Sequence, residues 1–146
     1  MGGSIMNETN LKKEVWGHFQ NMQQVFLATD EGTQPRVRPV TLIHFNDKFW
    51  ITTSTNSAKI KQIKDNKNYE FCLLLKEGDN SGYIRGSGEA NIVQDKDTKK
   101  LLADNTPFFK NFWKDADDPN YTLLEIVIKN VEYLKPGVFD VSRFTV

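Results

Sequence analysis

RVRPVTLIHFNDKFWITTSTNSAK, residues 36–59, is the stretch of the sequence that decides the fold. Its first part, residues 36–45, predicts a long strand, and residues 48–53 predict a second strand rich in aromatic and β-branched side chains. The Asn46-Asp47 pair between the two strands is a tight-turn signal. An antiparallel hairpin is therefore expected at the centre of the fold.

The period of the sequence changes at Ser57, where a helix is expected to begin. Ser57 is a good N-cap, and Ile60 and Ile63 share one helical face while lysines take the other. This pattern predicts a helix that continues to about Asn66. The second strand of the hairpin thus leads into the N-terminus of a helix.

Outside residues 36–59, four further segments predict strands and three predict helices. The strands are residues 25–29, 69–76, 83–93 and 122–134, and the helices are residues 10–21, 97–103 and 107–113. Gly86 and Gly88 lie inside one of these strands, where glycine usually marks a bulge, a barrel corner or a close approach of a ligand. Six strands with hairpin signals indicate a mainly β or α+β fold, an antiparallel barrel with a few flanking helices.

A single domain accounts for the chain. Its length of 146 residues argues against two full cores, and the sequence holds no internal repeat or linker. Residues 1–9 are expected to form a flexible leader, natural or added, and residues 10–146 one domain. A Rossmann fold is disfavoured because no glycine-rich turn joins a first strand to a helix.

Composition excludes several classes of function. Nineteen Lys and Arg residues balance nineteen Asp and Glu residues, so bulk charge indicates neither a nucleic-acid binder nor a membrane-surface protein. The single cysteine, Cys72, cannot form an intramolecular disulfide and is expected to be a small buried hydrophobe, and no Cys/His cluster has metal-ligand spacing. No apolar run approaches the roughly 20 residues of a membrane span, and no signal peptide is recognisable, so the protein is expected in the cytoplasm.

Two arginines and a proline make the first strand of the hairpin unusual. Pro39 removes a ladder donor, which places it at an edge, at a bulge or beside something other than a neighbouring strand. Arg36 and Arg38 stand next to it, and a guanidinium is well suited to holding a phosphate. The alternative is that both arginines are solvated on the outer face, and the strand alone favours that interpretation.

The start of the predicted helix forms a second candidate site. A helix N-terminus presents unpaired N–H groups and a partial positive charge, which suit an anion. Ser57 and Lys59 add a hydroxyl and an ammonium at the same end. For an isolated Ser-x-Lys, however, an N-capped helix with a surface lysine is the simpler interpretation.

Taken in order along the chain, these features resemble the FMN-binding split-barrel family that includes the pyridoxamine-phosphate-oxidase-like proteins. The short general-stress-protein subgroup is the most similar, and the resemblance covers about residues 25–93. It implies a six-stranded antiparallel split β-barrel of Greek-key topology, whose homodimer binds two FMN molecules in clefts between the subunits. Abundant aromatic residues could cover such an interface, including Trp50, Phe108, Phe109, Phe112 and Trp113.

The resemblance also implies roles for individual residues. The cofactor contacts that it assigns are Arg38, Val40, Thr41, Leu42, Thr52, Thr53, Ser57, Lys59 and Tyr83. The arginine opens the strand whose next residues run along the isoalloxazine ring, and the two adjacent threonines face the ring or the ribityl chain. The serine and the lysine meet the phosphate, and the tyrosine is supplied by the partner subunit.

Departures from the family pattern concern the substrate. Ala58 stands where the true oxidases usually have a second arginine, and Ile43 stands where a lysine meets the substrate phosphate. Residues 139–146 hold no counterpart of the substrate-binding arginine motif. We therefore expect FMN binding without the use of pyridoxamine phosphate.

The function implied is that of an FMN-dependent oxidoreductase of unknown substrate. No catalytic acid or base can be nominated; His44, beside the turn, is better explained as a partly exposed strand residue. The alternative is a non-catalytic module that stores or senses FMN, heme or deazaflavin in a stress response. A third interpretation is a flavin-free barrel in which Arg38 and Lys59 are only surface charges.

Overall fold

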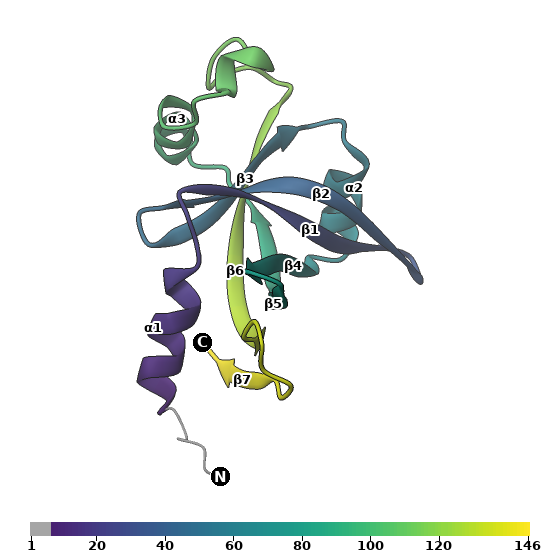
Figure 1. Cartoon of the computed structure of the whole chain (residues 1–146). Coiled ribbons are helices and arrows are strands. Elements are labelled where there is room, and N and C mark those ends of the chain that lie inside the picture. Colours follow the sequence, from purple (N-terminus) through teal and green to yellow (C-terminus); the bar gives the residue numbers. More distant parts are fainter. Residues whose placement is uncertain (1–6) are drawn as a thin grey trace.

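The computed structural model describes residues 7–146, which form seven strands, three α-helices and one turn of 3₁₀-helix (Figure 1). The strands are β1 (Met22–Glu31), β2 (Gln34–Phe45), β3 (Lys48–Ser54), β4 (Asn68–Glu77), β5 (Asn80–Ile92), β6 (Tyr121–Leu134) and β7 (Ser142–Thr145). The helices are α1 (Glu8–Gly17), α2 (Ala58–Asp65), α3 (Lys96–Asp104) and the 3₁₀-helix η1 (Phe109–Asn111).

Six of the strands form a closed antiparallel ring. The strand order is β3-β2-β1-β4-β5-β6-β7, and β3 also pairs with β6, which joins the two sides of the sheet. The predicted six-stranded antiparallel barrel of the split-barrel type is therefore confirmed. Strand β7 lies beyond the ring and pairs only with β6; its four residues are too short for a recognisable alternating pattern.

Tight turns connect β1 to β2, β2 to β3 and β4 to β5. Asn46 and Asp47 both have positive φ, 55° and 57°, which confirms the predicted tight turn of the central hairpin. Residues 77–82, expected to be a plain loop, instead form a two-residue turn in which Gly78 has a φ of 59°. That prediction was wrong because hairpin pairing extends both flanking strands into the polar segment.

Helix α1 is shorter than predicted at one end and longer at the other. It begins at Glu8, capped by the Asn7 side chain, so residues 7–9 are not a flexible leader; residues 1–6 lie outside the described part of the chain. The helix ends at Gly17 instead of continuing to Asn21, because β1 already begins at Met22 to pair with β2.

The two predicted helices after β5 differ in outcome. Residues 97–103 lie within α3, as expected, but residues 107–113 hold only the single turn η1. The aromatic side chains of this segment pack downward onto the sheet at irregular spacing, which a regular α-helix would not permit. Within residues 7–146, no helix is long and apolar enough to span a membrane.

The barrel is packed on both faces. The inner core is made of alternate residues of all six ring strands together with Val15 and Phe19 from the α1 region and Ile60 and Ile63 of α2. A second cluster lies on the outer face of β3 and β6, under α3 and η1, and contains Ile43, Trp50, Leu102, Ala103, Phe109, Trp113, Tyr121 and Leu123. In Figure 1, α3 and η1 lie at the end of β6 opposite to α1 and β7.

Both glycines of β5 are explained by close packing within the protein. The β5–β6 ladder shifts register between Ser87 and Gly88, which confirms a bulge, and a Cβ on Gly88 would lie 2.0 Å from the Val127 carbonyl oxygen. A Cβ on Gly86 would lie 2.6 Å from the Phe71 ring. The approach is therefore that of protein atoms and not of a ligand.

Gly86→Ala should destabilise the protein by about 1–3 kcal/mol, because the Phe71 ring must move inside a packed barrel. Gly17→Ala is the matched control: an added Cβ there meets no atom within 4 Å, and alanine favours the helix by roughly 0.5–1 kcal/mol. Urea unfolding of both variants measures the two changes. A Gly86→Ala variant as stable as the native protein would contradict this account of the barrel wall.

Candidate functional site

A cleft of about 470 Å³ opens on the outer face of the barrel between β2, β3 and the aromatic segment around η1. Its volume lies in the range of about 300–1,000 Å³ that small-molecule sites occupy. We call it the β2–β3 cleft, and its walls are Gln24, Pro39, Val40, Thr41, Ile51, Thr52, Thr53, Ser54, Lys59, Phe108, Phe112 and Trp113.

Strand alternation explains which side chains reach this cleft. Residues directly opposite in an antiparallel pair share a face, and Thr41 of β2 lies opposite Gln24 of β1, both of them in the cleft wall. The intervening Leu42 is fully buried in the barrel core. The cleft is thus built on the outward-facing rows of β1, β2 and β3.

Lys59 closes one end of the cleft from the first turn of α2. Its Nζ donates to Thr53 Oγ1 at 2.6 Å and to Ser57 Oγ at 3.3 Å, both neutral acceptors. No carboxylate of the described residues lies within ion-pair distance of it. Burial lowers the pKa of the Lys59 ammonium below its ordinary value, and the nearby positive charge of Arg38 lowers this pKa further.

Arg38 lies beside Lys59 but on the inner face of the barrel, opposite the buried Leu27. Its Nη1 donates to Thr29 Oγ1 at 2.8 Å and to the Leu27 carbonyl at 3.2 Å, and its Nη2 donates to Gln62 Oε1 at 2.8 Å. All three acceptors are neutral, and burial lowers the pKa of this guanidinium. A guanidinium has five N–H donors, so two remain for a further partner.

The lack of a carboxylate distinguishes Arg38 from the other arginines. Arg36 pairs with Glu31 at 2.8 Å, Arg85 pairs with Glu70 and Glu132, and Arg143 pairs with Glu132. Among the described residues, Arg38 has no such pair. The mouth of the barrel therefore holds two adjacent cations that no protein anion neutralises, as an anion-binding site requires.

A buried hydroxyl in the same cleft also lacks a partner. Thr52 Oγ1 is the one buried side-chain polar atom of the described residues that makes no hydrogen bond. A buried hydroxyl left unpaired costs free energy, about 1–3 kcal/mol, so its persistence is expected where a ligand completes it. Two unneutralised cations at one end, this hydroxyl in the wall and aromatic side chains opposite suit a flat, polar-edged molecule that carries an anionic group.

Comparison with known proteins supplies the family. Residues 10–137 match the family model described as "Pyridoxamine 5'-phosphate oxidase like". The chain belongs to the pyridoxamine 5'-phosphate oxidase-like family. The match spans the whole ring of six strands.

Individual relatives agree with this membership. General stress protein 26 of Bacillus subtilis (strain 168) is 25% identical over 133 residues, 90% of this chain and 94% of that protein. The crystal structure of General Stress Protein 26 from Bacillus anthracis str. Sterne is similar with a TM-score of 0.72 and 25% identity, over 92% of this chain and 99% of the other. A heme binding protein from Mycobacterium smegmatis shares the fold, with a TM-score of 0.71 and 14% identity over 86% of this chain and 53% of its own.

Five of the nine cofactor residues that the sequence predicts line the β2–β3 cleft of this pyridoxamine 5'-phosphate oxidase-like chain: Val40, Thr41, Thr52, Thr53 and Lys59. Ser57 stands at the N-cap position of α2, but its side chain makes no capping hydrogen bond and instead contacts Thr53 Oγ1 at 3.4 Å. Leu42 is buried in the core, so only its backbone is available to a ligand.

Tyr83 lies away from this cleft within one chain. It is on β5, opposite Leu74, and its hydroxyl donates to Glu132 at 2.7 Å, which raises the pKa of the phenol. A role for Tyr83 at the cofactor therefore depends on a second subunit, as the sequence analysis expected.

The aromatic residues predicted to cover a dimer interface mostly serve another purpose. Trp50, Phe109 and Trp113 are buried in the second cluster of the same chain, because α3 and η1 fold over the outer face of β3 and β6. That prediction was wrong for these three residues. Phe112 is 66% exposed and lies with Phe108 at the cleft mouth. Cys72 is likewise only half-buried, on the outer face of β4.

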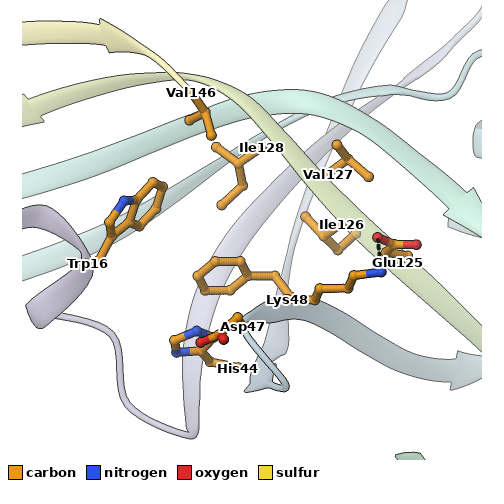
Figure 2. Close-up of a pocket in the computed structure, with 10 residues that line it drawn as sticks. Trp16, His44, Asp47, Lys48, Glu125, Ile126, Val127, Ile128 and Val146 are labelled. Carbon is orange, nitrogen blue, oxygen red and sulfur yellow. Dashed lines mark ion pairs between the residues drawn. The ribbon is translucent and has the colours of Figure 1, made fainter. Parts of the chain in front are cut away.

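His44 belongs to a second cavity of about 410 Å³, which Figure 2 shows between α1, the β2–β3 turn and β6. The imidazole stacks on Phe49 at 4.5 Å, which confirms that it is a partly exposed strand residue. Lys48 and Glu125 point toward each other across the rim and pair at 3.7 Å. The remaining wall is mainly apolar, and the cavity contains none of the nine predicted cofactor residues.

The sequence analysis missed the residues that hold Arg38, Thr29 on β1 and Gln62 on α2. Both are buried polar side chains, at 3% and 4% exposure. A signal was present for Gln62, since it shares the helical face of Ile63 and Lys59 at spacings of one and three residues. Its partner on another element could be identified only in three dimensions.

The charge on Lys59 should make the stability of the ligand-free protein depend on pH. Because the pKa of Lys59 is lower in the folded state than in the unfolded state, the unfolded chain binds more protons between the two values. The free energy of unfolding of the native protein should therefore rise, relative to that of Lys59→Gln, as the pH increases from 7 towards the ordinary lysine value of 10.5. Urea unfolding at several pH values tests this.

Lys61→Gln is the control for that experiment, because it removes an exposed ammonium from the same helix. Its unfolding free energy should follow the native pH dependence. Parallel curves for native and Lys59→Gln proteins would show that Lys59 is not buried as described.

Proposed function

We propose that this chain binds FMN in the β2–β3 cleft and acts as an FMN-dependent oxidoreductase. The observation that carries the proposal is the pair of cations, Arg38 and Lys59, which have only neutral partners at one end of the cleft. A phosphate dianion there would neutralise both charges and occupy the two free donors of the guanidinium. The α2 N-terminus and the Ser57 hydroxyl would supply further donors.

The remaining walls suit the rest of a flavin. Thr41 and the unpaired Thr52 hydroxyl would hydrogen-bond the polar edge of the ring, while Val40 and Phe108 would contact its faces. When bound, the flavin would accept a hydride from a reduced donor and pass electrons on. The protein would supply binding, orientation and shelter from water.

The substrate is not expected to be pyridoxamine phosphate. Ile43 is 3% exposed inside the second cluster, so no cation could reach a ligand from that position without disrupting the packing. Ala58 is exposed at the start of α2 and adds no charge. The two cations of the cleft would already be occupied by the cofactor phosphate, which leaves none of the cleft-lining charges for a second phosphate.

A homodimer would complete the site. Phe26, Val37 and Leu74 are 41%, 69% and 65% exposed on β1, β2 and β4, and we call them the outer-face patch. Phe26 lies opposite both Pro39 and Cys72, so the patch continues onto the cleft wall at Pro39. A second copy seated on this patch would cover apolar surface and bring a residue such as its own Tyr83 towards the cleft.

A non-catalytic flavin-binding module is the second candidate. Lys59 is the one titratable side chain among the residues that line the cleft, so the chain itself offers little for acid–base catalysis there. The same lining contains no His, Cys, Met or Tyr, the residue types that usually ligate heme iron, which favours a flavin over heme. Bleaching of the bound flavin by a nicotinamide donor would support the oxidoreductase, and failure of all tested donors the binding module.

Arg38→Ala and Lys59→Ala should each weaken FMN binding by about tenfold to a hundredfold, because a charge-assisted hydrogen bond contributes roughly 1.5–3 kcal/mol. Riboflavin lacks the phosphate, so its affinity should be lower in the native protein and nearly the same in both variants. Fluorescence quenching of each flavin on titration with protein measures the dissociation constants.

Arg36→Ala is the matched control, since Arg36 is on the same face of β2 but is already paired with Glu31. It should change FMN affinity much less than Arg38→Ala. Equal FMN affinities in the native, Arg38→Ala and Lys59→Ala proteins would mean that the phosphate binds elsewhere.

Leu74→Glu should convert the native dimer to monomers, because it places a charge in the centre of the outer-face patch. FMN affinity should fall with it if the partner subunit contributes to the cleft. Leu101→Glu, at an apolar residue of α3 that is 41% exposed, is the control and should remain dimeric. Light scattering at micromolar concentration gives the masses, and a native protein with the mass of one chain would refute the dimer.

A further inference from the structure

We infer that Gln62 is a positioning residue, which holds Arg38 in place without neutralising it and so makes the cleft selective for a phosphorylated flavin. This inference rests on the proposed function, because it assigns the role of Gln62 through the FMN phosphate. It concerns a residue outside the nine that the family resemblance assigns to the cofactor.

The geometry at Gln62 is that of a shared acceptor. Its Oε1 accepts from Thr29 Oγ1 at 2.6 Å and from Arg38 Nη2 at 2.8 Å, while Arg38 Nη1 donates to the same threonine hydroxyl at 2.8 Å. The three side chains form a closed triangle in which every contact is a normal hydrogen bond. Since Gln62 and Thr29 are buried, the guanidinium is fixed in position before any ligand arrives.

An amide suits this position better than a carboxylate. Gln62 also faces Glu31, and its hydrogen bond to that carboxylate contributes to the lowered pKa of Glu31. Only a side chain with an acceptor on one side and a donor on the other can serve both Arg38 and Glu31. A carboxylate at this position would pair with Arg38 and cancel the charge on which an anion depends.

The second cation is held by the same principle. Lys59 donates to two hydroxyls, Thr53 Oγ1 and Ser57 Oγ, and Gln62 follows it by three residues on the same helix. Residues three apart on a helix share a face, so one face of α2 carries both the lysine and the amide that holds the arginine. Each cation is thus oriented by neutral oxygens and keeps its full charge.

The test is Gln62→Glu, which keeps the size of the side chain and the acceptor for Thr29 and Arg38 but adds a negative charge. We expect the FMN dissociation constant to rise tenfold or more and that of riboflavin to change less than twofold. Because the new carboxylate faces Glu31, the variant is also made in a Glu31→Gln background, where the same selective loss of FMN affinity is expected. Gln34→Glu, an exposed residue at the start of β2, is the charge-matched control and should bind FMN like the native protein.

A second variant keeps the inference falsifiable if the new charge prevents folding. Gln62→Met retains length and burial but removes the acceptor, so Arg38 is no longer fixed and FMN affinity should fall while riboflavin affinity persists. Equal losses for both flavins would show a merely structural role and overturn the inference, as would unchanged FMN affinity in folded Gln62→Glu. Failure of the native protein to bind FMN would overturn the proposed function as well, so the two failures are distinguishable.

Discussion

The pairing of β3 with β6 is the contact on which the rest of the structure depends. It closes the sheet into a ring, and its register places Thr53 opposite Thr122 at the end of the ladder. Because β3 ends there, the chain turns and α2 begins at the rim, where Ile60 and Ile63 enter the inner core. Anchored in this way, α2 carries Lys59 and Gln62 to the mouth of the barrel, beside Arg38.

The position of the cleft follows from how the outer face is covered. Over most of β3 and β6 the covering layer is α3 and η1, which bury Trp50 and Tyr121 against the barrel. The layer ends at Phe112, whose exposed ring lies with Thr41 and Thr52 in the cleft wall. A closed barrel with a short cover on one side thus leaves a groove whose floor is β-sheet and whose rim is aromatic. Since loops and short helices tolerate change better than ring strands, the cover is the part in which relatives of the same fold can differ.

The ring of strands could be predicted from the sequence because local signals and long-range pairing agree there. The turn at Asn46 and Asp47 and the glycines of β5 each have one structural explanation, and the structure has it. The segment around η1 could not be predicted, since its aromatic residues suggest a helix by spacing while their burial is decided by contacts with β3 and β6. Likewise, Lys59 was recognisable from its place at a helix start, but Gln62 was not, because its significance depends on an arginine 24 residues away. Residues that act on a ligand follow local patterns, and residues that hold them follow only the folded geometry.

Two half-buried cations without counter-ions make the mouth of the barrel the least favourable part of the ligand-free fold. Desolvation lowers the pKa values of both Arg38 and Lys59, which means that each charge is less stable there than in water. The protein accepts this cost because carboxylate partners would remove it only by removing the affinity for an anion. On the proposed function, FMN binding relieves the cost, so folding and binding are linked: ligand at a hundred times its dissociation constant stabilises the native state by about 2.7 kcal/mol. The neutral acceptors around the two cations are therefore as much a part of the site as the charges themselves, because they orient each charge while leaving it for the ligand to neutralise.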